Sequence, residues 1–146
     1  MKLVIQRVSN ASVEVEDNTV GEINEGLMVL VGFGEGDSQK EADYLSKKLV
    51  KLRIFEDEEG RMNKSVKDIG GKLLLVPQFT LYAHTKKNRP SFHKALTPAK
   101  ANELFDYFVN KCKDLIDVET GEFGAFMNVS LLNCGPVTIL LEKEFD

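Results

Sequence analysis

The chain has 146 residues, 42% apolar and 29% charged, with a formal net charge of −4. That length is typical of one domain, here residues 1–146, which can bury a core without a metal or disulfide. The acidic balance argues against general polyanion binding, and no export signal or membrane span is predicted. Because the chain has only two cysteines, Cys112 and Cys134, both expected as small buried side chains, we expect a cytoplasmic protein.

The first half of the chain predicts strands followed by one helix. Alternating apolar residues or short apolar runs predict strands over residues 3–8, 12–16, 19–23 and 27–33. Ser38 and Glu41 then match a capping box, which predicts a helix start. The apolar residues at helical spacing after it predict a core-facing stripe: Ala42, Leu45, Leu49 and Leu52.

The second half predicts a buried strand, a helix and a final strand pair. The apolar run 72–82 predicts a strand, and Pro77 within it indicates a bulge or a sheet edge because proline lacks an N–H. Thr97 as N-cap and Pro98 at the first helical position predict a second helix. Further strands are predicted over residues 116–119, 127–132 and 137–142.

The order of these elements predicts the fold class. About eight strands and two separated helices do not repeat as βαβ units. We therefore expect an α+β domain whose largely antiparallel sheet curls into a barrel-like shape.

A glycine–proline pair, Gly135–Pro136, lies where the last two predicted strands meet. Proline is excluded from most strand interiors, and glycine allows another group to approach the backbone closely. The pair fits an ordinary turn between strands, and it also fits a rigid backbone feature with a cis or a trans peptide bond.

Catalytic motifs are scarce in this sequence. It contains no G-x-S-x-G or H-E-x-x-H motif, no P-loop and only two histidines. An enzyme of this kind would act by positioning and by backbone dipoles. Thr80 is the best side-chain candidate and Gln78 a hydrogen-bonding one, although a strand threonine and an edge amide also explain them. Three apolar residues near the C-terminal strands either line a nucleotide pocket or belong to the core: Phe123, Phe126 and Met127.

One basic segment stands out in the acidic chain. Residues 84–94 contain four Lys or Arg and no acidic residue. A solvated loop and a contact with an RNA phosphate backbone both fit this composition.

Six separated segments resemble the D-aminoacyl-tRNA deacylase, or D-tyrosyl-tRNA(Tyr) deacylase, family. They are residues 1–8, 52–57, 78–83, 89–92, 118–127 and 133–138. The most specific are Gln78-Phe79-Thr80-Leu81 and the pattern N-x-G-P-V-T, which begins at Asn133. Pro77 stands where the family usually has serine, which bears on chiral strictness or rate.

The resemblance implies hydrolysis of the ester between a D-amino acid, or glycine, and the tRNA 3′ end, with L-aminoacyl-tRNA spared. It implies a chiral proofreading step in translation, carried out without a metal or cofactor by a homodimer that binds aminoacyl-tRNA. Gly135–Pro136, with its bond cis, would enter the partner's site and exclude L side chains by a clash. Phe123 and Met127 would flank the terminal adenosine, and Arg7 would brace the Gly-Pro segment.

The same resemblance implies Gln78, Phe79 and Thr80 as the catalytic residues, which hold the aminoacyl group. Two mechanisms stay open: the Thr80 hydroxyl acts as nucleophile, or the substrate's own 2′-hydroxyl assists water. The absence of a base near Thr80 in the sequence favours the second.

Two other functions stay open from the residues alone. A non-enzymatic RNA-binding module would use the loop 86–94, but the net negative charge argues against it. A general esterase would need a nucleophile–base motif, and the sequence lacks one.

Overall fold

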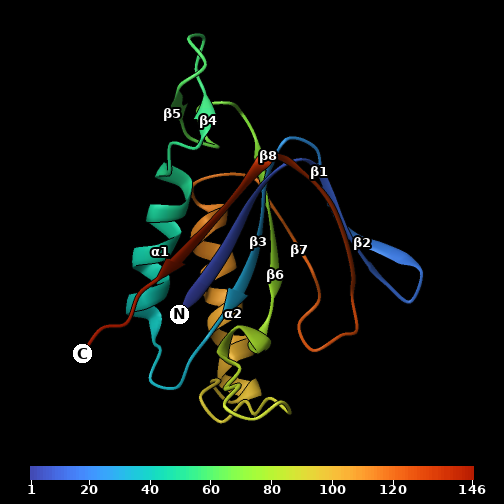
Figure 1. Cartoon of the computed structure of the whole chain (residues 1–146), viewed down its shortest axis with the longest axis vertical. Coiled ribbons are helices and arrows are strands. Elements are labelled where there is room, and N and C mark those ends of the chain that lie inside the picture. Colours follow the sequence, from blue (N-terminus) through green and yellow to red (C-terminus); the bar gives the residue numbers. More distant parts are fainter.

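The computed structural model describes residues 1–146, which form a six-stranded sheet, two helices and a small hairpin (Figure 1). The sheet consists of β1 (Lys2–Val15), β2 (Asn18–Ile23), β3 (Gly26–Gly32), β6 (Lys72–Pro77), β7 (Val118–Thr120) and β8 (Asn128–Glu142). The other elements are the helices α1 (Gln39–Lys51) and α2 (Pro98–Lys113), the hairpin of β4 (Phe55–Glu56) and β5 (Met62–Lys64), and a 3₁₀ turn, η1 (Phe79–Tyr82).

The sheet is mixed: the expected antiparallel pairing is found in three of its five strand pairs, and the other two pairs are parallel. Its order is β2-β1-β3-β6-β7, with β8 also paired to β1. β1 is antiparallel to β2, β3 and β8, whereas β3–β6 and β6–β7 are parallel pairs. Each parallel pair is joined by a segment that contains one helix, because a parallel connection must return to the same end of the sheet.

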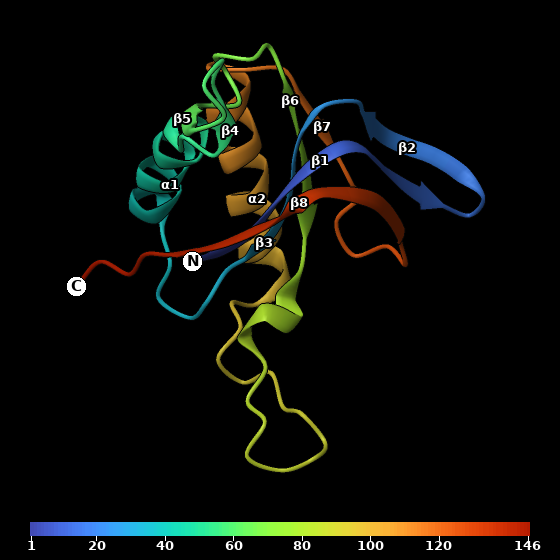
Figure 2. The same ribbon diagram turned by 45° about the horizontal axis from the view of Figure 1, so that its top comes forward.

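The two long strands are each continuous where the sequence predicted two. β1 pairs with β3 over Lys2–Val8 and with β2 over Ala11–Val15, while β8 follows its other side. The resulting curl is visible in Figure 2. It brings β2 against β7, since a Cβ added at Gly21 would lie 2.5 Å from the carbonyl oxygen of Thr120. The barrel-like shape predicted from the sequence is confirmed as a nearly closed sheet.

The core lies on both faces of this sheet. Leu73 and Leu75 belong to the larger cluster, which also contains residues of α1 and α2, whereas Leu74 and Val76 belong to a smaller cluster with Val13. Burial on both faces explains why β6 is a continuous apolar run without alternation. In Figure 1 the two helices lie together on one side of the sheet.

Both helices begin where predicted. The N–H of Lys40 donates to Ser38 Oγ at 3.3 Å, and the N–H of Ser38 donates to Glu41 Oε1 at 2.9 Å. The C-terminal residues return to this helix start, where the N–H of Phe145 donates to Glu41 Oε2 at 3.0 Å. Neither helix is long and apolar enough to cross a membrane.

The two cysteines differ in burial. Cys112 on α2 is fully buried, and burial raises the pKa of its thiol to about 12. Cys134 is only half-buried, contrary to prediction, because it lies in the irregular part of β8.

Candidate active site

The first candidate segment lies at the end of β6, where the sheet turns into η1. The prediction that Gln78 to Tyr82 continue the strand was wrong. Leu73 donates its N–H toward β7 and Leu75 accepts there from Gly121. Because the backbone alternates along a strand, the nitrogen of Pro77 also points toward β7. Pro77 lies two residues beyond Leu75, the last β6 residue that pairs with β7. The N–H that proline lacks therefore costs no β6–β7 hydrogen bond, and the strand ends at this residue.

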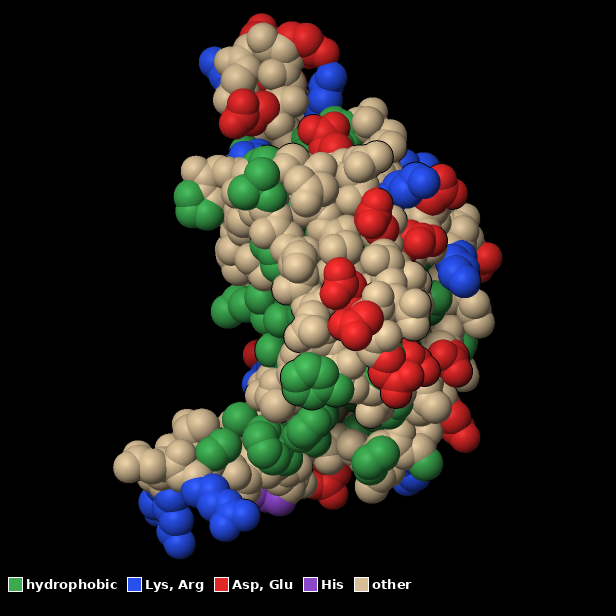
Figure 3. Space-filling view, turned by 90° about the vertical axis from the view of Figure 1, so that its right-hand side faces the viewer, with side chains coloured by type: hydrophobic (Ala, Val, Ile, Leu, Met, Phe, Trp, Pro, Cys, Tyr) green, Lys and Arg blue, Asp and Glu red, His purple; other side chains and the backbone are tan.

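A cavity of about 560 Å³ opens at this edge of the sheet. It is lined by Val31, Phe33, Pro77, Gln78, Phe79, Phe92, His93, Ala95, Leu96, Thr97, Pro98, Ala101, Phe123 and Gly124. Its volume and mostly apolar lining are typical of a small-molecule site. In Figure 3 hydrophobic side chains gather beside the protruding loop at the lower edge.

Gln78 is fixed by both its backbone and its side chain. Its N–H donates to the carbonyl of Val31 at 2.8 Å, and its side-chain Nε2 donates to Thr80 Oγ1. Phe79 is 58% exposed and packs edge-to-face on Phe92, with ring centroids 4.9 Å apart. These contacts hold a short backbone stretch at the cavity wall.

The hydroxyl of Thr80 has no general base beside it. Its hydrogen-bond partner is the Gln78 amide, which does not accept a proton near neutral pH. His93 lines the cavity, but its Nδ1 lies 3.1 Å from Ser91 Oγ. No three His, Cys, Asp or Glu side chains lie close enough together to hold a metal ion. The hydrogen bond from Gln78 thus joins the Thr80 hydroxyl to an amide and not to a carboxylate or an imidazole.

The second candidate segment is a bulge inside β8, so the alternative of an ordinary turn between two strands is wrong. Gln6 pairs with Thr138 and Val8 pairs with Asn133, so the four residues 134–137 stand opposite the single residue Arg7. The Gly135-Pro136 peptide bond is cis, and Gly135 has a φ of 140°. Both residues are exposed to solvent.

Two side chains hold this bulge from either end. Arg7 Nε donates to the carbonyl of Cys134 at 2.9 Å, and its Nη1 donates to the carbonyl of Ile54 at 2.8 Å. The side chain of Asn133 accepts the N–H of Val137 at 2.8 Å and donates to that residue's carbonyl at 3.1 Å. The Gly135–Pro136 pair is thus held by its neighbours while it remains exposed to solvent.

The structure brings some of the candidate residues together and keeps others apart. Gln78, Phe79 and Phe123 line one cavity. Gly135–Pro136 does not line it, and Met127 packs against the smaller core cluster instead.

Sequence reasoning missed several residues of this region as site residues. Phe92, His93 and the first turn of α2 line the cavity, and Asn133 holds the bulge. The signal for Phe92 and Asn133 was their place in the family-like segments.

Comparison with known proteins decides the family. The D-Tyr-tRNA(Tyr) deacylase family matches over residues 4–142. The chain belongs to this family. It is 53% identical to the D-aminoacyl-tRNA deacylase of Thermosipho africanus (strain TCF52B), over 99% of this chain and 98% of that protein. It is 52% identical to the D-aminoacyl-tRNA deacylase of Chloroherpeton thalassium (strain ATCC 35110 / GB-78), over 98% and 96%.

Two solved structures share the fold of this chain. A protein described as c-Myc DNA Unwinding Element Binding Protein is 40% identical, with a TM-score of 0.95 over 99% of this chain and 100% of that one. A structure described as a probable eukaryotic D-amino acid tRNA deacylase is 18% identical, with a TM-score of 0.82 over 96% and 97%, and it shows the shared fold. The family predicted from the sequence is confirmed.

Proposed function

We propose that this protein is a D-aminoacyl-tRNA deacylase, a hydrolase that cleaves the ester between a D-amino acid, or glycine, and the 3′ end of tRNA. The observation that carries the proposal is identity of 52–53% over nearly the whole chain to proteins of that name. The reaction is a chiral proofreading step of translation, and we propose that the protein acts in the cytoplasm, where its aminoacyl-tRNA substrate is used.

The active unit that we propose is a homodimer. Within one chain, the exposed Gly135–Pro136 pair does not line the cavity that holds Gln78 and Phe79. The outer edge of β8 pairs with no other strand, and large apolar side chains are exposed along or beside it: Phe126, Val129, Leu132 and Leu140. Long apolar edge strands are surfaces on which a second chain pairs or packs. A partner's Gly135–Pro136 would complete the cavity.

Chiral selection follows from a main-chain wedge in this arrangement. The wedge occupies the space that the side chain of an L-amino acid needs, whereas a D side chain points away from it and glycine has none. Because the wedge is backbone held by Arg7 and Asn133, it does not move aside as a flexible side chain would. Rejection by a clash, rather than by weaker attraction, distinguishes the two hands.

The remaining site residues receive the following roles. Gln78, Phe79 and Thr80 hold the aminoacyl group at the end of β6. Phe123 lines the cavity and packs against the terminal adenine. Met127 supports that wall from behind, because its Sδ would lie 2.7 Å from a Cβ added at Gly121, two residues before Phe123.

Hydrolysis proceeds by attack of water on the ester carbonyl, with the 2′-hydroxyl of the terminal ribose assisting. The bond between the carbonyl carbon and the 3′ oxygen of the ribose then breaks. The 3′ oxygen takes a proton, and the free amino acid leaves. The bond from Gln78 to Thr80 supports this route, since it leaves the threonine hydroxyl without a base.

A parallel deacylation time course on D-tyrosyl-, L-tyrosyl- and glycyl-tRNA tests the proposal. We expect the protein to release D-tyrosine and glycine. We expect L-tyrosyl-tRNA to be hydrolysed no faster with the protein than in buffer alone. A brief alkaline treatment of each substrate confirms that the ester is present. The proposed function would be refuted if the D-tyrosyl ester stayed intact after incubation with protein at a concentration at which it is dimeric.

A second candidate is nucleic-acid binding without hydrolysis. The basic segment 84–94 favours it, as does the description of the structure with 40% identity as a DNA-binding protein. Salt-sensitive binding of many unrelated RNAs and DNAs, with every aminoacyl ester left intact, would support this candidate instead.

A further inference from the structure

Positive charge is concentrated in one part of this acidic chain. Between Asp68 and Glu103 there are six Lys or Arg and no acidic residue, so all 23 acidic residues lie elsewhere. Residues 83–94, here called the cationic hairpin, hold Lys86, Lys87 and Arg89 near its tip. Figure 3 shows Lys and Arg side chains clustered on the part of the molecule that protrudes at the lower left.

The cationic hairpin is held by its own hydrogen bonds. The N–H of His84 donates to the carbonyl of Ser91 at 2.8 Å, and the N–H of Ser91 donates back at 3.0 Å. The rings of His84 and His93 pack edge-to-face with centroids 5.2 Å apart. These contacts close the loop, and Figure 2 shows it extending away from the sheet and both helices.

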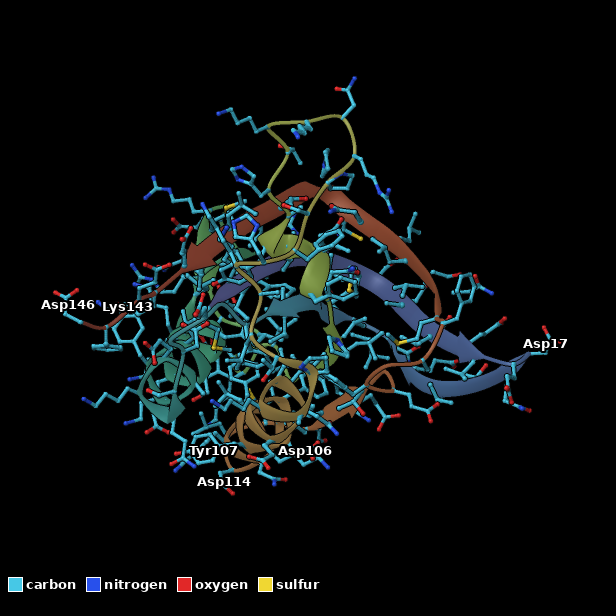
Figure 4. The ribbon with its side chains drawn as sticks, turned by 90° about the horizontal axis from the view of Figure 1, so that it is seen from below. Asp17, Asp106, Tyr107, Asp114, Lys143 and Asp146 are labelled. Carbon is cyan, nitrogen blue, oxygen red and sulfur yellow. The ribbon has the colours of Figure 1, made fainter.

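The tip of this hairpin is exposed and its charges are free. Every residue from 85 to 90 is exposed, and no Lys or Arg among them forms a salt bridge. In Figure 4 nitrogen-ended side chains extend from the loop into solvent, on the opposite side of the view from Asp106 of α2 and from Asp114, which follows α2. Unpaired cations without acidic neighbours attract a polyanion over several ångströms.

The base of the hairpin is a wall of the cavity. Phe92 packs on Phe79, and His93 lines the same space. The hairpin therefore starts at the wall of the cavity in which the proposed function puts the 3′ ester.

We propose that the cationic hairpin binds the ribose-phosphate backbone of the tRNA acceptor end, next to the cavity that takes the terminal aminoacyl-adenosine. This inference rests on the proposed function and adds the surface that engages the remainder of the tRNA. Lys and Arg contacts to phosphate are the usual source of affinity for nucleic acid. An acidic protein partner fits less well, because the tip 85–90 has no large apolar side chain to bury at an interface.

Removal of three tip charges tests the inference by direct binding. The variant is Lys86→Ala/Lys87→Ala/Arg89→Ala, and the control Lys47→Ala/Lys48→Ala/Lys51→Ala removes three exposed charges from α1. Fluorescence anisotropy measures the affinity for fluorescently labelled tRNA that carries no amino acid, between 50 and 500 mM salt. Each phosphate contact contributes about 0.7 to the slope of log K against log[salt]. Loss of three contacts should lower the slope by about 2, and the affinity by about 100-fold at 0.1 M salt.

Kinetic assays on two substrates distinguish a tRNA-binding role of the hairpin from a role in the reaction itself. On D-tyrosyl-tRNA the hairpin variant should show a raised KM at unchanged kcat. On D-tyrosyl-adenosine, which has the ester and no phosphate, variant and wild type should be equal. Equal losses on both substrates would instead assign the hairpin to the reaction site and overturn the inference.

Other results overturn it as clearly. The inference fails if the α1 control loses as much affinity as the hairpin variant, or if the salt slope does not change. It also fails if polyglutamate of equal charge competes with tRNA as well as unlabelled tRNA does. Thermal unfolding of each variant at the wild-type temperature excludes misfolding as the cause.

These measurements distinguish failure of the inference from failure of the proposed function. A wild-type protein that hydrolyses D-tyrosyl-tRNA, with unchanged tRNA binding in the hairpin variant, removes only the inference. A wild-type protein that binds tRNA through the hairpin and leaves the ester intact removes only the proposed function.

Discussion

Replacement of Arg7 by Met should loosen the Gly135–Pro136 bulge while it keeps most of the side chain's apolar stem. Arg7 donates two charge-assisted hydrogen bonds, to the carbonyls of Cys134 and Ile54. These bonds tie the start of the bulge to the segment that follows α1. No other side chain stands opposite the bulge, because Arg7 is the single β1 residue facing residues 134–137.

The structure sets the size of the effect. Hydrogen bonds to a charged group contribute about 1.5–3 kcal/mol each, but Arg7 is half-buried, so water replaces part of the loss. We expect the free energy of unfolding to fall by about 2 kcal/mol, which lowers Tm by about 4–8 °C for a chain of this length. If all of that energy restrains the wedge, discrimination against L-aminoacyl-tRNA falls by at most about 30-fold.

Two assays are needed together. Thermal unfolding gives the stability change, and the ratio of kcat/KM for D-tyrosyl- and L-tyrosyl-tRNA gives the selectivity. Arg7→Lys keeps the charge but cannot reach both carbonyls with a planar fork, so it should lie between Met and wild type. Arg61→Met, an exposed arginine on the turn before β5, is the matched control and should change neither quantity. A normal D/L ratio in Arg7→Met despite the lower Tm would refute the bracing role.

Three further predictions follow from single contacts. Thr80→Ala should keep kcat within about tenfold of wild type, since its hydroxyl bonds to Gln78 and not to a base; a loss of about 10³-fold in single-turnover assays would restore it as nucleophile. Leu132→Glu, at a side chain 58% exposed on β8, should shift sedimentation toward monomer and reduce turnover, whereas Val20→Glu on β2 should do neither. Burial raises the pKa of Glu41, but hydrogen bonds from Phe145 and Ser38 lower it further, so its net pKa is below the usual value. Glu41 therefore adds stability above about pH 4.5 that is lost as the pH falls through the lowered pKa, and denaturant titrations should show the gap between wild type and Glu41→Gln closing between pH 6 and pH 3.

Local chemistry made several elements predictable. The capping pair Ser38 and Glu41 fixed the start of α1, and Pro98 fixed the start of α2. These signals act within one helical turn, so they depend little on the rest of the fold. The continuous apolar run of β6 likewise predicted a strand buried on both faces.

Other features depended on contacts between distant segments. Whether β3 and β6 run parallel is decided by where the intervening α1 segment returns the chain, and no local signal carries that information. Proline fits at the end of β6 because the last β6–β7 pair, Leu75 with Thr120, lies two residues before Pro77. The bulge at Gly135–Pro136 needs Arg7 opposite it, more than a hundred positions away in the chain.

The sequence by itself determined the family, the helix starts and the core strands, because short-range propensity and motif letters suffice for these. Only the tertiary structure decided that Gln78 and Phe79 share a cavity with Phe92 and Phe123, while Gly135–Pro136 faces solvent on β8. The physical reason is that a site is defined by which backbones approach one another, and that approach is set by strand register and sheet curl rather than by neighbouring residues.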